Sequence, residues 1–423
     1  MTNTKLARDG GDKIRLTPFP TVNNSTGRTI GIEEIQAVEE VLRSGELNRT
    51  IATHSRVKSF ELAFCEWLGV DQAVASTSGT SALHLAVAAI DPNPGDEIIV
   101  TPITDFGSII PIIAQNAVPV FADVLPGTWC VDPESIRANI TDRTRAIIVV
   151  HLFGQPADLD PILAIAAERQ IPVIEDCSQA YGSLYKGQKV GTFGTIGCFS
   201  LQQSKHITSG DGGLTVTNDP HLAYRMRLFS DKGWPRECEL RTHLYYGVNY
   251  RMTELQGAIG GAQLPKLDGV LAARRRAGHL LESLLNELPG ISLPTLPGGS
   301  GSESVYWLFP VDLDTEKLGV SVAEFAAAVQ AEGIPASPGY VVPMYLTPAL
   351  SEGKTYGDSH FPFDSPYTTR SYKDFVPGLC PVAESMSTRM LVLPINEKFT
   401  DDDVRDIAAG FAKVIAALVA TRS

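Results

Sequence analysis

The sequence lacks the features that would place the protein in a membrane or on nucleic acid. No apolar run reaches the ~18 residues that a membrane-spanning helix needs, and the N-terminus has no basic stretch followed by an apolar one, as a signal peptide would have. The 35 basic residues against 48 acidic ones give a net charge of −13, which argues against non-specific binding to nucleic acid or anionic lipid. We therefore expect a cytoplasmic protein.

Cysteine motifs and nucleotide-binding motifs are also missing. The six cysteines show neither Cys-x-x-Cys nor Cys/His ligand spacing, so we predict no metal site and no disulfide framework. No strand-linked Gly-x-Gly-x-x-Gly and no Gly-x-x-x-x-Gly-Lys-[Ser/Thr] occurs, which excludes a dinucleotide fold and a P-loop. At 423 residues and 43% hydrophobic, the chain can form one large domain and a smaller one.

Continuous apolar strands alternate with helical stretches in the first two thirds of the chain. Strands of this kind are typical of a mainly parallel sheet that is buried on both faces. Ligands bind such sheets at the carboxyl ends of the strands. The expected strand ends place Thr104 and His151 there, although for His151 we favour a structural role over one at the pocket. The strands are expected within 94–102, 118–124, 146–151 and 172–175.

One lysine, Lys205, stands between an apolar strand and a glycine-rich turn. A lysine becomes a nucleophile when its amine is partly desolvated, because burial lowers the pKa and frees the lone pair. The glycines of segment 210–213 allow a cofactor to lie close to the main chain. Taken alone, such a lysine is more often a solvated turn residue, so other segments must decide.

A second signal is Asp176, at the end of an apolar strand. Pyridoxal phosphate (PLP) needs a carboxylate against its pyridine nitrogen, so that the protonated ring can draw electrons from the substrate carbon. An acidic strand end also occurs in ordinary α/β sheets. The full order, a strand with Asp176 and then a strand followed by Ser200-x-x-x-x-Lys205 and a glycine-rich turn, is much more selective.

A third signal is the small-residue turn Ser78-Gly79-Thr80, between a short strand and a long helix. Backbone N–H groups at the positive end of a helix suit a phosphate dianion. The same three residues also fit an ordinary helix N-cap. Beside a candidate Schiff-base lysine, we prefer the phosphate-binding interpretation.

These segments resemble the DegT-like sugar aminotransferase family of fold-type I PLP enzymes, from about Gly31 to Leu267 and more weakly beyond. The resemblance implies an α/β fold: a large domain with a mainly parallel, seven-stranded-type sheet between helices, and a smaller C-terminal α+β domain. We expect an N-terminal arm at 1–28, a PLP-binding domain at 29–265, and a small domain at 266–423 with a long loop at 340–384.

The resemblance also implies roles for residues of the site. Lys205 would form a Schiff base with PLP, and Asp176 would pair with the pyridinium. Gln179 would bond the phenolic oxygen of the ring, and Ser200 would hold the phosphate together with the turn that begins at Ser78. Asn249 lies in an Asn-Tyr-Arg-Met segment, whose asparagine in related enzymes reaches the PLP phosphate of the other subunit.

One position departs from the family pattern. In many members an aromatic residue follows the threonine that matches Thr104, and it stacks on the PLP ring. This chain has Asp105 there and Phe106 one place later. Phe106 is therefore the predicted stacking residue, and a core role for Phe106 is equally open.

The implied function is a PLP-dependent aminotransferase that works as a homodimer with shared active sites. It would move an amino group from glutamate or glutamine to a keto sugar or ketocyclitol, whether free, phosphorylated or nucleotide-linked, in amino-sugar or aminocyclitol biosynthesis. Relatives with histidine in place of the lysine dehydrate deoxysugars, so the retained Lys205 favours transamination. The alternatives are a PLP-binding sensor or scaffold without turnover, and a PLP dehydratase or aminoshikimate-type ring-forming enzyme.

Overall fold

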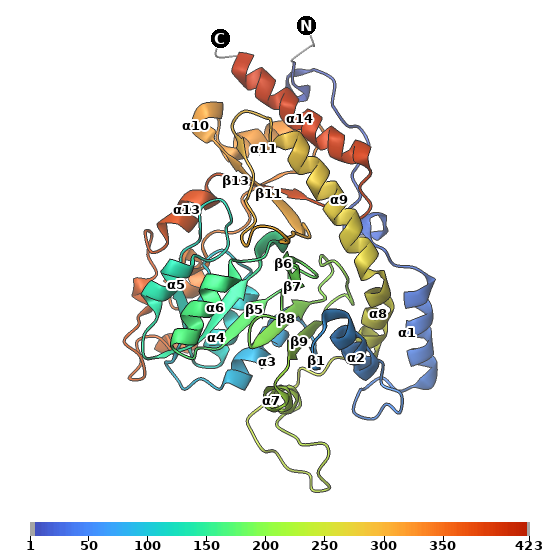
Figure 1. The fold of residues 1–423 in the computed structure, drawn as a ribbon, viewed down its shortest axis with the longest axis vertical. Helices are drawn as coiled ribbons and strands as arrows, with labels where there is room; N and C mark the ends of the chain where they lie inside the picture. The colour runs from blue at the N-terminus through green and yellow to red at the C-terminus, as the bar shows by residue number, and fades with distance from the viewer. Residues whose placement is uncertain (1–4, 421–423) are drawn as a thin grey trace.

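The computed structural model describes residues 5–420, which build two hydrophobic cores. The larger core holds a seven-stranded sheet between helices, and the smaller one, at the top of Figure 1, holds a four-stranded antiparallel sheet. This arrangement confirms the predicted α/β fold class. None of the described helices is long and apolar enough to cross a bilayer. That the two cores are separate domains stays a prediction.

The large sheet sets the position of every strand end around the site. Its strands are β1 (Gln72–Ser76), β2 (Glu97–Val100), β3 (Val118–Phe121), β4 (Thr144–Val150), β5 (Val173–Asp176), β8 (Ile196–Ser200) and β9 (Gly213–Thr217). Their order is β1-β9-β8-β5-β4-β2-β3, and only β9 runs antiparallel to its neighbours. The carboxyl ends of the other strands therefore lie at one edge of the sheet, where ligands of such folds bind.

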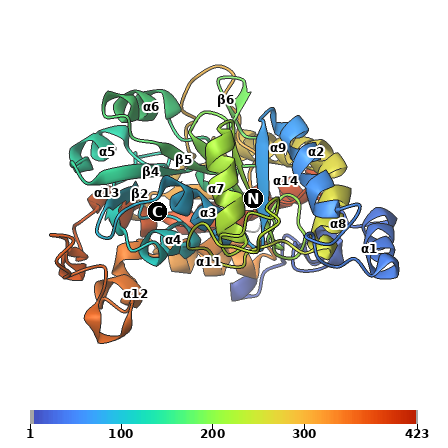
Figure 2. The same cartoon turned by 90° about the horizontal axis from the view of Figure 1, so that it is seen from below.

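Helices cover both faces of this sheet because its strands are apolar on both faces. They are α2 (Arg56–Leu68), α3 (Gly79–Ile90), α4 (Ile110–Ala114), α5 (Pro133–Asn139), α6 (Leu159–Glu168) and α7 (Pro220–Ser230). Helices α4 and α7 both pack against α3, and Figure 2 shows these three on the opposite side of the sheet from α5 and α6. Helix α3 is buried over nearly its whole length. It begins at Gly79, shortly after β1 ends at Ser76.

A row of helices links the large core to the small one. Helices α1 and α2 both pack on α8, and α9 continues from α8 into the small core, where it packs on α14 (Figure 1). The small sheet has the strand order β10-β11-β13-β12. These elements are α1 (Ile32–Ser44), α8 (Glu254–Gln263), α9 (Leu267–Leu285), β10 (Ile291–Ser292), β11 (Leu308–Leu313), α10 (Thr315–Leu318), α11 (Val322–Ala331), β12 (Ser337–Pro338), β13 (Met390–Pro394) and α14 (Asp401–Ala420).

The N-terminal arm, described from residue 5, lies across the small core. Leu6 is buried in that core, and Arg15 forms ion pairs with Asp403 at 2.7 Å and Asp406 at 2.9 Å on α14. The arm then descends past the lysine segment to α1. The first part of the chain is therefore packed onto its own small core.

The segment 340–384 has little regular structure but packs closely on the large core. It contains the short helix α12 (Pro348–Ser351) and runs into α13 (Pro381–Ser387). Phe363 and Phe375 are buried in the large core, and Arg370 pairs with Glu97 of β2 at 2.7 Å. The segment therefore covers the β2–β3 edge, although it follows the small-core helix α11 in sequence.

A buried carboxylate holds the main chain beneath the end of β5. Glu175 lies on β5, the central strand of the sheet, and accepts hydrogen bonds from the backbone N–H groups of Gly191 at 2.7 Å, Phe193 at 2.8 Å and Gly194 at 2.6 Å. These three residues follow the hairpin of β6 (Leu184–Tyr185) and β7 (Gln188–Lys189). The carboxylate therefore accepts the backbone N–H groups of this loop, as the carbonyl groups of a neighbouring strand would in a sheet.

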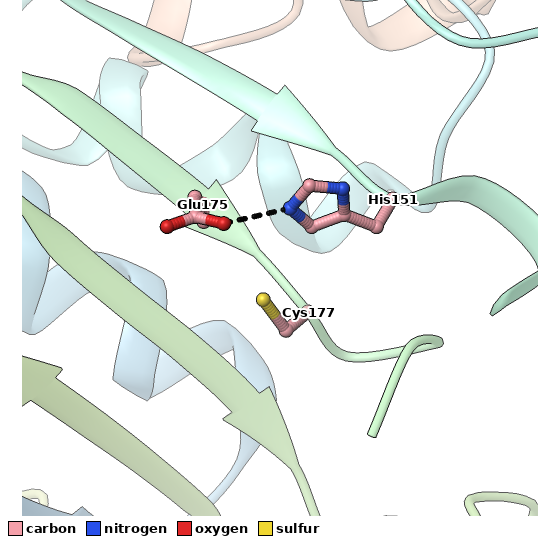
Figure 3. Close-up of side chains that lie close together, drawn as sticks. All are labelled: His151, Glu175 and Cys177. Carbon is pink, nitrogen blue, oxygen red and sulfur yellow. Dashed lines mark hydrogen bonds and ion pairs between the residues drawn. The ribbon is translucent and has the colours of Figure 1, made fainter. Parts of the chain in front are cut away.

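His151 completes this network from the end of β4, as Figure 3 shows. Its Nε2 bonds the Glu175 carboxylate at 3.0 Å, and its Nδ1 accepts the backbone N–H of Ala157 at 3.0 Å. The imidazole is therefore a neutral tautomer with the proton on Nε2. Cys177 lies beside the pair, but the polar atoms of His151 and Glu175 are already used in hydrogen bonds. The cluster thus fixes the backbone at Ala157 and in the loop of residues 191–194.

We expect that Glu175→Ala lowers the free energy of unfolding by at least about 3 kcal/mol, because it leaves several buried donors without an acceptor. Urea unfolding followed by circular dichroism measures this change. Glu168→Ala, which removes an exposed carboxylate of α6 that pairs with Arg137 at 2.8 Å, is the matched control and should cost less than about 1 kcal/mol, because exposed ion pairs contribute little. A loss below about 1 kcal/mol for Glu175→Ala would contradict the role given to this carboxylate.

Candidate active site

A cavity of about 390 Å³ lies at the carboxyl edge of the large sheet, and seven of the nine predicted site residues line it. They come from the ends of β1, β5 and β8 and from the turn that precedes β9. The fold thus brings together segments that are more than a hundred residues apart. The seven are Ser78, Gly79, Thr80, Asp176, Gln179, Ser200 and Lys205.

Lys205 is almost completely buried, with its Nζ 3.9 Å from the ring centroid of Trp307. Burial disfavours the charged amine and lowers its pKa to about 8, while the carboxylates of Asp176 and Asp105 partly oppose this shift. A buried amine with a lowered pKa is a candidate nucleophile and proton carrier. The structure therefore gives Lys205 the environment that the sequence predicted.

Asp176 is held by donors on both carboxylate oxygens. The hydroxyl of Ser108 donates to Oδ2 at 2.7 Å, and the backbone N–H of Ser178 donates to Oδ1 at 3.0 Å. The Ser108 hydroxyl is itself within 2.8 Å of the Thr104 hydroxyl. This chain of hydrogen bonds fixes the direction in which the carboxylate faces the cavity.

The N-terminus of α3 forms an anion site opposite Lys205. Ser78 caps the helix, and its Oγ accepts the backbone N–H of Ser81 at 3.0 Å. The first N–H groups of a helix have no acceptor within it, so those of Gly79 and Thr80 are available to a ligand. A Cβ on Gly79 would lie 2.6 Å from the Ser200 Cβ. Only glycine therefore allows this turn and Ser200 to approach so closely.

Gln179 presents its amide to the cavity in one fixed orientation. Its Oε1 accepts the backbone N–H of Phe153 at 2.8 Å, and its Nε2 donates to the Tyr340 hydroxyl at 3.0 Å. Burial raises the pKa of Tyr340, and the negative charge of Asp105 adds to this shift. The phenol is therefore a neutral hydrogen-bonding group at physiological pH.

Sequence reasoning missed Trp307 and Tyr340, which both line the cavity. Trp307 packs under the amine of Lys205, and its Nε1 donates to the Ser204 carbonyl at 3.0 Å. Tyr340 lies edge-on to Phe153, with ring centroids 5.0 Å apart. Neither residue belongs to a motif. The only signal was the aperiodic segment that starts at Tyr340.

Phe106 does not line the cavity, whereas its neighbours Asp105 and Gly107 do. Phe106 is half-buried and packs against the large core. Asp105 caps the turn of residues 106–108 by accepting the Gly107 N–H at 2.7 Å. This placement supports the core interpretation of Phe106 and gives no support to the stacking role, which stays a prediction.

Asn249 is exposed in the single chain and lies outside the cavity. It pairs through its backbone with Asp231, beside the loop between α7 and α8. A phosphate contact within the same subunit is therefore not seen. This position is compatible with the predicted reach into a second subunit.

The cavity residues match the groups that PLP carries. The N-terminus of α3 and Ser200 offer donors for a phosphate, Asp176 offers a carboxylate for the pyridine nitrogen, and Lys205 offers an amine for the aldehyde. The tight approach of Gly79 to Ser200 leaves no room for a side chain where the phosphate would lie. The site therefore fits this cofactor.

In the cofactor-free protein, we expect the Lys205 amine to become reactive with a pH midpoint near 8 rather than at the ordinary value of 10.5. Below that midpoint the amine is protonated and inert, and above it the free base reacts. Asp105→Asn should move the midpoint lower, because the Asp105 charge favours the protonated form.

Labelling with a small acylating reagent, with the Lys205 peptide quantified by mass spectrometry, gives this midpoint. Asp211→Asn is the matched control, since Asp211 also lines the cavity without contributing to the pKa of Lys205. A wild-type midpoint near 10 would show that the amine is solvated.

Several known proteins are similar to this chain in both sequence and fold. L-glutamine:2-deoxy-scyllo-inosose aminotransferase of Streptomyces lividus is 36% identical over 429 residues, which cover 97% of each chain. GDP-perosamine synthase of Caulobacter vibrioides is 35% identical over 85% of this chain and 90% of its own. The solved structure of an aminotransferase from Psychrobacter cryohalolentis superposes with a TM-score of 0.82 at 30% identity, over 93% of this chain and 99% of the other.

Residues 28–372 match the model of the DegT/DnrJ/EryC1/StrS aminotransferase family. This match covers most of the chain and includes every residue assigned to the cavity. It confirms the predicted family, and with it the predicted cofactor. The protein therefore belongs to the DegT/DnrJ/EryC1/StrS aminotransferases and is a PLP-dependent enzyme.

Proposed function

We propose that the protein transfers the amino group of glutamine to the carbonyl of a polyhydroxylated six-membered ring, and that the acceptor is a free ketocyclitol. The observation that carries this proposal is the convergence, in one cavity, of the buried Lys205 amine, the Asp176 carboxylate and the N-terminus of α3. An amine, an acid and an anion site are the three groups that PLP-dependent amino transfer needs.

Lys205 is the residue that moves the proton. When bound, PLP supplies an aldehyde that condenses with amines and a ring that draws electrons from the neighbouring carbon. Lys205 would hold the cofactor through its Nζ. Its pKa of about 8 lets Nζ accept a proton and return it near neutral pH. One positioned base of this kind contributes about 10²- to 10⁴-fold in rate.

The other cavity residues orient the cofactor. Asp176, whose two oxygens are held by Ser108 and Ser178, would keep a proton on the pyridine nitrogen. The amide of Gln179 would donate to the phenolic oxygen of PLP. The N-terminus of α3 and the Ser200 hydroxyl would hold its phosphate. Each of these groups is fixed by the fold before ligand binds, which favours catalysis.

The charges of the cavity favour an uncharged acceptor. Three carboxylates line it, those of Asp105, Asp176 and Asp211, against the single amine of Lys205. A phosphorylated or nucleotide-linked ketone would bring further negative charge into this site. The comparisons point the same way: the relative named for 2-deoxy-scyllo-inosose aligns over 97% of this chain, and GDP-perosamine synthase aligns over 85%.

The active unit is a homodimer with shared sites, in which Asn249 reaches the phosphate of the partner subunit. Part of the loop between α7 and α8 extends away from the rest of the chain below α7 (Figure 1). It exposes Leu240, Tyr245 and Tyr246, and apolar side chains exposed together mark interaction surfaces. The exposed position of Asn249 beside this loop supports its role between subunits.

The test of this function is amino transfer with purified protein, PLP and glutamine, against three acceptors: a free ketocyclitol, a keto sugar phosphate and a nucleotide-linked keto sugar. We expect an amine product from the ketocyclitol and at least ~10²-fold less from the Lys205→Ala variant. Lys58→Ala, an exposed lysine outside the cavity, should behave as wild type. Full turnover by Lys205→Ala would overturn the mechanism, and preference for a nucleotide-linked acceptor would overturn the substrate assignment.

We expect Gly79→Ala to weaken PLP binding at least ~10-fold, because the new Cβ forces Ser200 and the phosphate site apart. Equilibrium dialysis against PLP measures the affinity. In Gly269→Ala the added methyl group meets no atom within 4 Å, so this control should bind PLP normally. Equal affinities in the two variants would place the phosphate elsewhere.

A further inference from the structure

Arg28, at the end of the N-terminal arm, contacts the catalytic lysine from behind the cavity. Its Nη1 donates to the backbone carbonyl of Lys205 at 2.9 Å, across 177 residues of sequence. Arg28 is only 5% exposed and does not line the cavity. The contact is therefore to the main chain of the lysine and leaves its amine free.

The energetics of Arg28 argue against a role in stability alone. Burial lowers the pKa of this guanidinium, and the positive charge of Arg274 adds to the cost, while Glu397 provides partial compensation. The Nε of Arg28 has no hydrogen-bond partner, and neither does the Oε1 of Glu397. A buried charge that is incompletely paired costs free energy and calls for another explanation.

The arm is anchored at two points that precede this contact in the sequence. The Asn396 amide donates to the Gly27 carbonyl at 3.0 Å, next to Arg28. The Gln203 amide donates to the Val22 carbonyl at 2.8 Å. The arm is thereby tied both to the small core and to the lysine segment, and neither of these two bonds involves the Lys205 carbonyl.

Two donors from distant parts of the chain hold consecutive carbonyls of the lysine segment. Trp307 donates from its Nε1 to the Ser204 carbonyl at 3.0 Å, and Arg28 donates to the Lys205 carbonyl. The Lys205 N–H donates to the Gln202 carbonyl at 2.9 Å. The backbone of Lys205 is therefore held on both sides, while its side chain carries no hydrogen bond to the protein.

We propose that Arg28 is a positioning residue for amino transfer: it fixes the main chain of Lys205 so that only the side chain moves when Nζ carries the proton. This inference rests on the proposed function. It assigns a catalytic consequence to the N-terminal arm, which otherwise looks like a packing segment. A misplacement of about 1 Å in a reacting group can cost ~10²-fold in rate.

The test compares Arg28→Met and Arg28→Lys with Gln203→Ala, which removes a tie between the same arm and the same segment but leaves the Lys205 carbonyl bonded. We expect kcat of Arg28→Met to fall ~10- to 100-fold with the KM for the amino donor changed by less than about threefold. Arg28→Lys, which keeps the charge and one donor, should recover part of kcat. Gln203→Ala should keep the wild-type kcat.

Two further readouts separate positioning from folding. The first is the pH at which the absorption band of the Lys205-bound cofactor is half changed. We expect this midpoint to differ from wild type in Arg28→Met and to match wild type in Gln203→Ala. The thermal unfolding midpoints of the two variants should lie within about 3 °C of each other. An unchanged kcat and band in Arg28→Met, or a fall in kcat that Gln203→Ala shares, would overturn the inference. If Arg28→Met does not fold, the kcat and band of Arg28→Lys decide in the same way.

The failure of this inference differs from the failure of the proposed function. If borohydride reduction of the wild-type protein with PLP does not modify Lys205, the proposed function is wrong and the Arg28 role is overturned with it. If Lys205 is modified and ketocyclitol is aminated, but Arg28→Met matches wild type, only the Arg28 role is wrong.

Discussion

The burial of one amine beside carboxylates is the constraint around which the cavity is arranged. Water would keep Lys205 protonated at every physiological pH, and a dry apolar pocket would keep its amine neutral and unable to hold a proton. Its position over Trp307, with Asp176 and Asp105 near enough to oppose the loss of charge, places the pKa between these limits. A group that must both attack and carry protons works best there.

The sheet makes this balance possible because it delivers polar groups to a single edge. β1, β5 and β8 end there, and a parallel sheet buried on both faces has few other places for polar side chains. The same rule explains the Glu175–His151 network. Glu175 precedes Asp176 by one residue, and its carboxylate lies inside the sheet layer, where it must be fully hydrogen-bonded. Along β5, adjacent carboxylates thus serve opposite purposes: Glu175 fixes the loop below, and Asp176 faces the ligand.

The sequence pointed to those candidate site residues whose signal lies in the residues next to them in the chain. Lys205 with its glycine-rich turn, Asp176 at its strand end and Ser78-Gly79-Thr80 at a helix start each carry a signal within about ten residues, so pattern and physical reasoning found them. Trp307, Tyr340 and Arg28 carry no such signal. Trp307 reaches the site only through the packing of the small core, Tyr340 through the aperiodic segment and Arg28 through the arm. Their side chains are ordinary in sequence, and only their position gives them a role.

Asp105 affects the site in more than one way. An aromatic residue there would add apolar surface and no charge. The aspartate instead caps the turn of residues 106–108, and that turn carries Ser108, the donor that holds Asp176. Its charge also reaches two cavity residues: it partly opposes the burial that lowers the pKa of Lys205, and it adds to the burial that raises the pKa of Tyr340. Asp105 thus links three properties of the site: the orientation of Asp176, the protonation of Lys205 and the sign of the charge that the acceptor meets. Replacing it with an aromatic residue would alter all three together.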